Sequence, residues 1–133
     1  MHNDTLYLDH CQRLAEIAAT RNESPVGSVV VMIDQMIGQG IESSKFYQDI
    51  TYHAEVEAIR DAVKKYGTDL SGATLYTTHE PCILCSYVIR HHRISRVVIK
   101  KAVAYVGGAS SRFPILTTSD IPVWVSPPIV EFI

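Results

Sequence analysis

The chain has 133 residues and a formal net charge of −2, with 47% hydrophobic and 20% charged residues. This composition is typical of a globular protein and excludes a disordered chain, and no apolar run reaches the roughly 18–20 residues that a membrane span needs. The N-terminal segment MHNDTLYLDH carries acidic residues and lacks the apolar core of a signal peptide, so we expect a cytoplasmic protein. We interpret residues 1–133 as one domain.

Hydrophobic periodicity and turn residues predict the elements in chain order. The predicted helices cover 4–21, 53–65 and 81–92, and the predicted strands cover 26–33, 36–42, 73–79, 96–103 and 121–126. Asn3 or Asp4 is expected to cap the first helix, and Pro127 and Pro128 are expected to end the last strand. Residues 105–120, rich in Gly, Ser, Pro and Thr, are predicted to form a long functional loop. A hairpin followed by strands that alternate with helices predicts an α/β sheet covered by helices on both faces.

Charge and cysteine content narrow the function classes. The acidic net charge disfavours binding to a nucleic-acid backbone, because such binding depends mainly on neutralising the phosphates with basic side chains. The one basic cluster, RHHRISR at 90–96, is interpreted as a solvated helix end. Three cysteines, an odd number, argue against a disulfide framework. Cys11 lies on an apolar helical stripe and is expected to be a buried structural thiol.

The segment HAE at 53–55 places a histidine and a carboxylate in the first turn of a predicted helix. Glu55 lies three residues before Ala58 and four before Ile59, so it faces the same apolar side as these residues. A carboxylate on an apolar face is costly unless it is paired or neutralised. The helix dipole favours a first-turn Glu but does not explain its inward direction. His53 alone is also compatible with a cap or a core residue.

The segment PCILC at 81–85 places two thiols three positions apart on one face of the next helix start. A helix N-terminus lowers the pKa of a thiol and favours the thiolate that metals bind. Such a pair alone is compatible with a redox pair or with half of a zinc ribbon, although a ribbon needs a second pair and the sequence has none.

Taken together, His53, Cys82 and Cys85 supply one imidazole and two thiolates, which are ligand types that zinc prefers. Three protein ligands leave the fourth tetrahedral position for water, as in catalytic rather than structural zinc sites. Zinc lowers the pKa of bound water to ~7. Glu55, which is not a ligand, is placed to take the proton of that water. The sequence therefore predicts one Zn²⁺ per chain, with water or hydroxide as its fourth ligand.

The combined pattern, HAE followed by PCxxC, resembles the signature of the zinc-dependent nucleobase deaminases. The chain is similar to the cytidine/deoxycytidylate deaminase superfamily, in particular to its branch of tRNA adenosine, guanine and fungal-type cytosine deaminases. The resemblance covers most of residues 5–105 and includes PVGSVVV at 25–31, HAEVEAIR at 53–60, TLYTTHEPCILC at 74–85 and RISRVV at 93–98. It implies a three-layer α-β-α sandwich around a mixed five-stranded sheet.

The resemblance also implies roles for single residues. His53, Cys82 and Cys85 are expected to bind zinc. Glu55 is expected to carry a proton from the zinc-bound water to the ring nitrogen and then to the departing ammonia. Water attacks the carbon that bears the exocyclic amine, which becomes a carbonyl. Deaminases of this kind are usually dimers or larger, so a homodimer is expected.

Glu42 departs from the family pattern. In this branch an Asn after the second strand usually hydrogen-bonds the substrate, and the segment GQGIESS at 38–44 places Glu42 there. The only asparagines, Asn3 and Asn22, do not fit this position. An ionised carboxylate accepts hydrogen bonds but cannot donate them. Either the alignment slips here, or the substrate presents donors where the substrates of relatives present an acceptor.

Four further side chains are candidates for substrate contacts. His79 is expected in the pocket wall or facing solvent, with a fourth zinc ligand as the alternative. Glu80 matches the EPC sequence of several family members, and a plain helix-start carboxylate is the alternative. Trp124 or Phe132 is expected to close the pocket on a flat base, although aromatic residues also serve as core.

The leading hypothesis is a hydrolytic deaminase of a free base, a nucleoside or a small base-like heterocycle. The mild net charge supports it, and the end of the chain at residue 133 leaves no room for the basic C-terminal helix that tRNA-editing relatives often carry. A tRNA-specific adenosine-to-inosine deaminase is the alternative. Two other hypotheses are a non-catalytic domain stabilised by zinc and a thiol redox protein with a Cys82–Cys85 disulfide.

Overall fold

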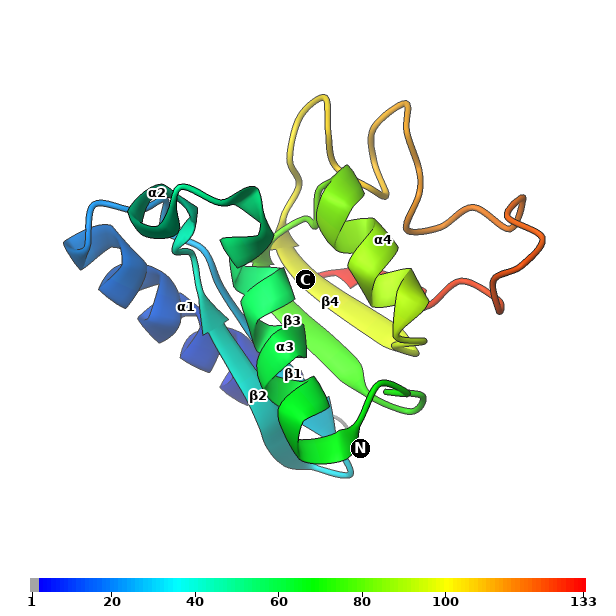
Figure 1. Ribbon diagram of the computed structural model, residues 1–133, viewed down its shortest axis with the longest axis horizontal. Coiled ribbons are helices and arrows are strands. Elements are labelled where there is room, and N and C mark those ends of the chain that lie inside the picture. The colour runs from blue at the N-terminus through cyan, green and yellow to red at the C-terminus, as the bar shows by residue number, and fades with distance from the viewer. Residues whose placement is uncertain (1–2) are drawn as a thin grey trace.

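A computed structural model of the chain describes residues 3–133 and shows a central sheet with helices on both faces (Figure 1). Within these residues the sheet has five strands in the order β2-β1-β3-β4-β5, namely β1 Gly27–Met32, β2 Gln35–Ile41, β3 Thr74–His79, β4 Arg96–Lys101 and β5 Ile129–Phe132. The helices are α1 Asp4–Thr20, α2 Ser44–Tyr47, α3 Ala54–Tyr66 and α4 Ile83–His91, and a 3₁₀ turn, η1, covers Ile50–Tyr52. None of the helices in this part of the chain is long and apolar enough to span a membrane.

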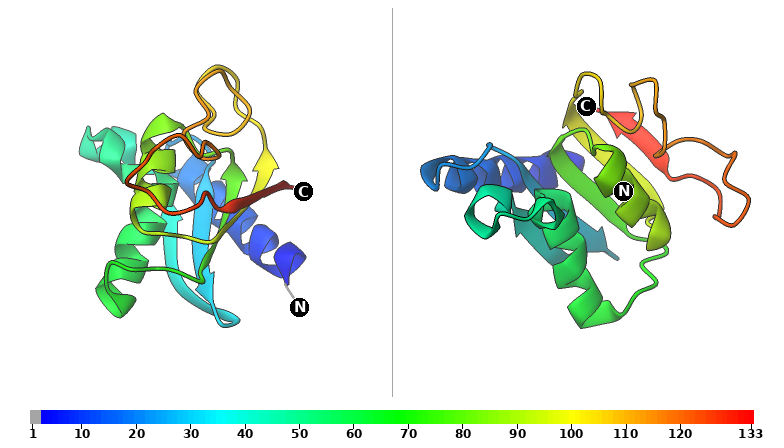
Figure 2. Two further views of the ribbon diagram at one scale, coloured as in Figure 1. Left: turned by 90° about the vertical axis from the view of Figure 1, so that its right-hand side faces the viewer. Right: turned by 45° about the horizontal axis from the view of Figure 1, so that its top comes forward.

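The sheet is mixed, as expected. β1 is antiparallel to β2 and to β3, whereas β4 is parallel to β3 and to β5. Because successive side chains of a strand alternate, Val29 and Val31 of β1 face α1, and Val30 faces α3 and α4. Figure 2 shows α1 on one side of the sheet and α3 and α4 on the other. Helix layers on both faces explain why β1 is hydrophobic without alternation, and the expected three-layer α/β fold is confirmed.

The last strand lies later in the chain than the sequence predicts. Residues 121–126, predicted as a strand, belong to the connection between β4 and β5, and Pro127 and Pro128 precede β5 instead of ending a strand. The ladder to β4 begins only after the prolines, where Ile129 donates its N–H to the carbonyl of Ser95 at 3.0 Å. Since proline has no N–H to donate, the segment with Pro122, Pro127 and Pro128 is poorly suited to this ladder.

Cys11 lies in the layer formed by α1 and the sheet. Its side chain is fully buried, and burial raises the pKa of its thiol to about 12. This environment fits the expected structural thiol. Asn3 precedes the first residue of α1, but its side chain does not cap the helix.

Helix α3 packs unusually close to β2. A Cβ atom built on Gly40 would overlap the carbonyl oxygen of Ala54, and one built on Gly38 would overlap the carbonyl oxygen of Ala58. Only glycine allows the helix backbone to come this near to the strand. Since Ala54 is the first residue of α3, the contact at Gly40 lies at the start of this helix.

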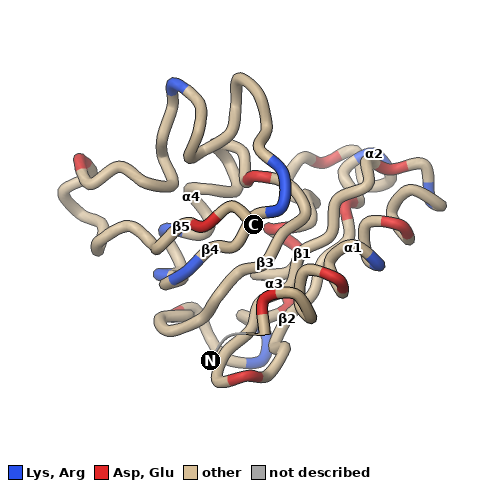
Figure 3. The backbone as a smooth tube through the Cα atoms, turned by 180° about the vertical axis from the view of Figure 1, so that it is seen from behind, with Lys and Arg blue, Asp and Glu red and all other residues tan. Residues whose placement is uncertain are grey.

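Two arginines of the 90–96 segment are buried, so its interpretation as a solvated helix end is wrong for them. Arg90 is 3% exposed and Arg96 is 8% exposed. The Arg96 guanidinium donates to both carboxylate oxygens of Asp4, at 2.8 and 2.9 Å, and to those of Glu131, at 2.8 and 3.1 Å. One cation therefore ties α1 and β5 to β4. The Lys and Arg positions as a whole are spread over helices, strands and connections (Figure 3).

Replacing Arg96 tests the importance of this cation. We expect Arg96→Met to lower the free energy of unfolding by about 2–4 kcal/mol, because Asp4 and Glu131 would lose their shared partner. Urea denaturation measures the change. Lys100→Met, on the same strand but with an exposed side chain, is the matched control and should change stability little. Equal stabilities of the two variants would contradict the prediction.

Candidate metal centre and active site

His53 is held at the start of α3. The η1 turn ends directly before it, and Asp49 caps that turn by accepting the N–H of Thr51 at 2.9 Å. His53 itself is extended, with φ −59° and ψ 149°, and occupies the N-cap position of α3. The chain therefore turns into the helix at His53, which leaves the imidazole at the helix end.

The two cysteines are held at the start of α4. Cys82 is extended and occupies the N-cap position, and Cys85 lies in the first turn. The backbone of Cys82 also forms a β-bridge with Gly107. Cys85 is fully buried, whereas Cys82 is partly exposed. Both thiols are therefore fixed by the same helix start, as the spacing predicts.

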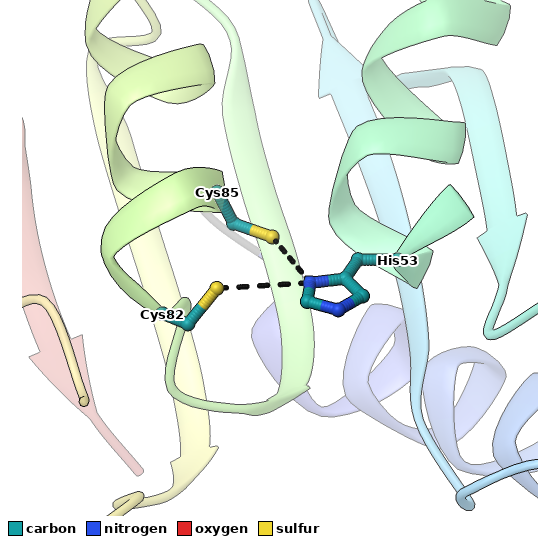
Figure 4. A group of neighbouring side chains, drawn as sticks. All are labelled: His53, Cys82 and Cys85. Carbon is teal, nitrogen blue, oxygen red and sulfur yellow. Dashed lines mark hydrogen bonds between the residues drawn. The ribbon is translucent and has the colours of Figure 1, made fainter. Parts of the chain in front are cut away.

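The three side chains converge, as Figure 4 shows. One ligand atom from each of His53, Cys82 and Cys85 lies within 4.8 Å of the others. The Nδ1 atom of His53 is 3.4 Å from Sγ of Cys85 and 3.6 Å from Sγ of Cys82. Zinc–nitrogen and zinc–sulfur bonds at tetrahedral angles would separate N and S atoms by about 3.6 Å. The spacing of the donors thus fits a single zinc ion.

The three side chains shift one another's pKa values, and the contact with Cys82 raises the pKa of the His53 imidazole to about 9. Hydrogen bonding with Cys85, and then with His53, lowers the pKa of the Cys82 thiol to about 4. The contact with Cys82, together with burial, raises the pKa of Cys85. The protein groups alone therefore stabilise one thiolate but not two. A divalent cation between the sulfur atoms would stabilise both.

Glu55 lies beside this group without belonging to it. Its side chain is 5% exposed, and burial is the main reason that the pKa of its carboxyl is raised to about 8. Glu55 lines the same pocket as His53 and Cys82. A carboxyl that binds and releases protons near neutral pH is suited to proton transfer.

The pocket beside the group has a volume of about 260 Å³. It is lined by Ser24, Val26, Glu42, Ser44, His53, Glu55, His79, Glu80, Cys82 and Val103. Three of the five predicted substrate contacts, namely Glu42, His79 and Glu80, are among these residues. The two serines and two valines were not predicted, because these residue types carry no chemical signature in a sequence.

Glu42 follows β2 and is 7% exposed. One carboxylate oxygen accepts the N–H of Ala54 at 3.3 Å, at the start of α3. The other oxygen accepts both the N–H and the hydroxyl of Ser44. The carboxylate is thus held by the chain on either side of it while it lines the pocket.

His79 lies at the end of β3 in the pocket wall. Its Nδ1 atom is 3.0 Å from the hydroxyl of Thr78. Burial, with a smaller effect of Lys101, holds the pKa of its imidazole below the ordinary value. Among residues 3–133, the converging ligand atoms do not include His79. Its position agrees with the pocket-wall interpretation and not with a fourth ligand.

Trp124 and Phe132 are not among the residues that line the pocket, contrary to the expectation that one of them closes it. The Trp124 ring packs against Tyr87, with ring centroids 5.3 Å apart, and under the guanidinium of Arg90 at 4.8 Å. Phe132 lies on β5, opposite Ile99 of β4. Trp124 instead packs on Tyr87 and Arg90 of α4, which are distant in sequence, and the residue pattern did not indicate these contacts.

Glu80 organises the loop after β4. Its carboxylate accepts the N–H groups of Val103, Ala109 and Ser110 at 2.7–2.9 Å and the hydroxyl of Ser110 at 2.6 Å. Burial alone would raise the pKa of Glu80, but these hydrogen bonds bring it below the ordinary value. Glu80 therefore fixes the segment that brings Val103 to the pocket, and its own acceptors are already used.

Glu80→Gln tests this anchoring. The Gln amide would turn N–H groups toward backbone donors, so we expect the loop around residues 103–110 to open more often. Hydrogen exchange of the Val103, Ala109 and Ser110 amides should become about 10- to 100-fold faster. Glu16→Gln, on the exposed face of α1, is the control. Unchanged exchange at all three amides would show that Glu80 does not hold the loop.

A family model described as "Cytidine and deoxycytidylate deaminase zinc-binding region" matches residues 1–101. The chain belongs to this deaminase family. It is 43% identical over 100 residues to a tRNA-specific adenosine deaminase of Buchnera aphidicola subsp. Baizongia pistaciae, a match that covers 74% of this chain and 62% of that protein. It is 37% identical over 111 residues to a tRNA-specific adenosine deaminase of Aquifex aeolicus, which covers 83% of this chain and 74% of that protein. The chain thus spans less than two thirds of the Buchnera relative.

Solved structures agree with this family. One, from biochemical and structural studies of A-to-I editing by tRNA deaminases at the wobble position of transfer RNA, matches with a TM-score of 0.87 and 27% identity. That match covers 97% of this chain and 99% of the other. Guanine deaminase from Bacillus subtilis matches with a TM-score of 0.71 and 33% identity, over 77% of this chain and 66% of that one.

Proposed function

We propose that this family member is a zinc-dependent hydrolytic deaminase that converts an exocyclic amine of a nucleobase-like ring into a carbonyl and releases ammonia. The observation that carries the proposal is the convergence of His53, Cys82 and Cys85 beside a pocket that His53 and Cys82 line together with Glu55. The three donors form the ligand set, and Glu55 is a buried carboxylate outside it. A purely structural zinc site is closed by four protein ligands and does not require a buried carboxylate beside them.

The proposed mechanism divides the work between the ligands and Glu55. Zinc supplies Lewis acidity, which makes hydroxide available near neutral pH. Glu55 accepts one proton from the attacking water and donates it to the ring nitrogen, and it then accepts the second proton from the hydroxyl of the addition product and donates it to the leaving amine. Water thus adds to the carbon that bears the amine, the C–N bond breaks and ammonia leaves. Burial suits Glu55 for this task, because it raises the pKa of the carboxyl to about 8 and so allows both the protonated and the ionised form near neutral pH.

Two substrate classes fit the pocket. A volume of about 260 Å³ suits a single base better than a larger ligand, since drug-sized pockets begin at about 300 Å³. A free base or small heterocycle is the first candidate. Adenosine within tRNA is the second, and the sequence similarity to proteins named tRNA-specific adenosine deaminases favours it.

Glu55→Gln separates catalysis from structure. The variant should keep its fold and its zinc but lose turnover by about 100- to 10,000-fold, because Gln cannot transfer the proton. Ammonia release from guanine, cytosine, adenine, their nucleosides and an anticodon stem-loop measures turnover, and elemental analysis measures zinc. Glu57→Gln is the matched control, since Glu57 lies on the same helix and pairs with Arg60. A zinc-replete wild type inactive on every compound would favour a non-catalytic domain.

The ligand set has its own test. Cys85→Ser should reduce the zinc content of purified protein well below one per chain, because the neutral hydroxyl is a poor zinc ligand. Cys11→Ser, which alters a buried thiol on the other face of the sheet, should leave zinc content unchanged. Wild-type protein that carries a Cys82–Cys85 disulfide and no zinc would support the redox hypothesis instead.

A further inference from the structure

Glu42 is held rigidly in the pocket. Its backbone N–H donates to the carbonyl of Val26 at 3.1 Å, and its carboxylate accepts from Ala54 and Ser44. Only 7% of the residue is exposed. A side chain fixed by backbone on both sides cannot turn away from a ligand without breaking these contacts.

The Glu42 carboxylate offers hydrogen-bond acceptors to the pocket. Its two oxygens have about four acceptor positions. Three donors from the described chain use them, two of them on one oxygen. The oxygen that accepts from Ala54 therefore retains a position for a further donor. This position can accept an N–H or O–H group of a ligand in the pocket.

The charge of the pocket favours a ligand without phosphate. Among residues 3–133, the lining of this pocket includes three glutamates, Glu42, Glu55 and Glu80, and neither Lys nor Arg. A phosphate next to the reacting ring would lie near the carboxylates of Glu42 and Glu80 and would find no Lys or Arg in the lining to pair with it. A neutral or protonated heterocycle meets no such repulsion.

From this geometry we infer that Glu42 determines substrate specificity by accepting a ring N–H of a free base or a base-like heterocycle. This assignment rests on the proposed function, since Glu42 and Glu55 would contact the same ring. A hydrogen bond from N–H to a carboxylate is about twice as strong as one between neutral groups. A ring nitrogen that presents its lone pair would instead face an oxygen lone pair, and binding would weaken.

This specificity separates the two candidate substrates. In adenosine the sugar replaces one ring N–H, and N7 presents an acceptor. Its only N–H donors belong to the amine that reacts. Glu42 therefore favours free bases that carry a ring N–H and disfavours adenosine in RNA.

A double-change cycle, in which Glu42 of the enzyme and one ring N–H of the substrate are altered separately and together, tests the assignment. Wild type and Glu42→Gln are each assayed for kcat/KM with guanine, cytosine and adenine, and with analogues in which a methyl group replaces one ring N–H. For the free base that is turned over, Glu42→Gln should lower kcat/KM about 10- to 100-fold. For the analogue that lacks the contacted N–H, it should lower kcat/KM less than about threefold. The steric effect of the methyl group occurs in both enzymes and cancels in the ratio.

Inhibition constants replace kcat/KM for analogues that are not turned over. Glu16→Gln is the matched control, and Glu42→Asn repeats the test should Glu42→Gln not fold. If the substitution lowers activity equally with every free base and its analogues, Glu42 serves only to cap α3 and the assignment is overturned. Deamination of the stem-loop, with no free base bound, would overturn it while supporting a deaminase. Ammonia release from none of the compounds would count against the proposed function as well.

Discussion

The close approach of α3 to β2 is the constraint on which the geometry of the pocket depends. Gly40 leaves room for the carbonyl of Ala54, so the helix starts against the strand and not above it. On the same face of the sheet, α4 starts where β3 ends (Figure 1). The two helix starts therefore face each other with His53 on one and Cys82 and Cys85 on the other. A side chain at Gly40 would displace one half of the proposed zinc site from the other half.

Three glutamates share this pocket, and their surroundings give them different chemistry. Glu55 is buried, and its pKa is raised to about 8. The Glu80 oxygens accept hydrogen bonds from one loop, and these bonds bring its pKa below the ordinary value. Glu42 is fixed by the start of α3 and by Ser44, with an acceptor position remaining. Residue type alone does not separate the proposed proton carrier from the loop anchor or from the proposed specificity determinant, whereas the burial of each carboxylate and the number of its donors do.

The parts of the site that follow from local chemistry were predictable from the sequence. His53, Cys82 and Cys85 carry a recognisable ligand chemistry, and two helix starts bring it together. The outer strand and the arginines were not predictable in the same way. β5 needs β4 as its partner, and Arg90 finds its acceptors 25 or more residues away, in a segment without periodicity. Hydrophobic patterns predict which apolar faces are buried. They do not predict which distant carbonyls accept hydrogen bonds from a single buried charge.

The connection between β4 and β5 is held mainly through its backbone. Arg90 donates to the carbonyls of Ile115, Leu116, Thr118 and Val125, and Glu80 accepts three backbone N–H groups near the start of the same connection. Every residue type has a carbonyl and every type except proline has an N–H, so these backbone contacts do not depend on the side chains of the residues that make them. Glu80 before α4 and Arg90 in its last turn thus hold the path of this segment mainly through its backbone. Substitutions within this connection that spare Glu80 and Arg90 therefore leave the two groups that anchor it in place.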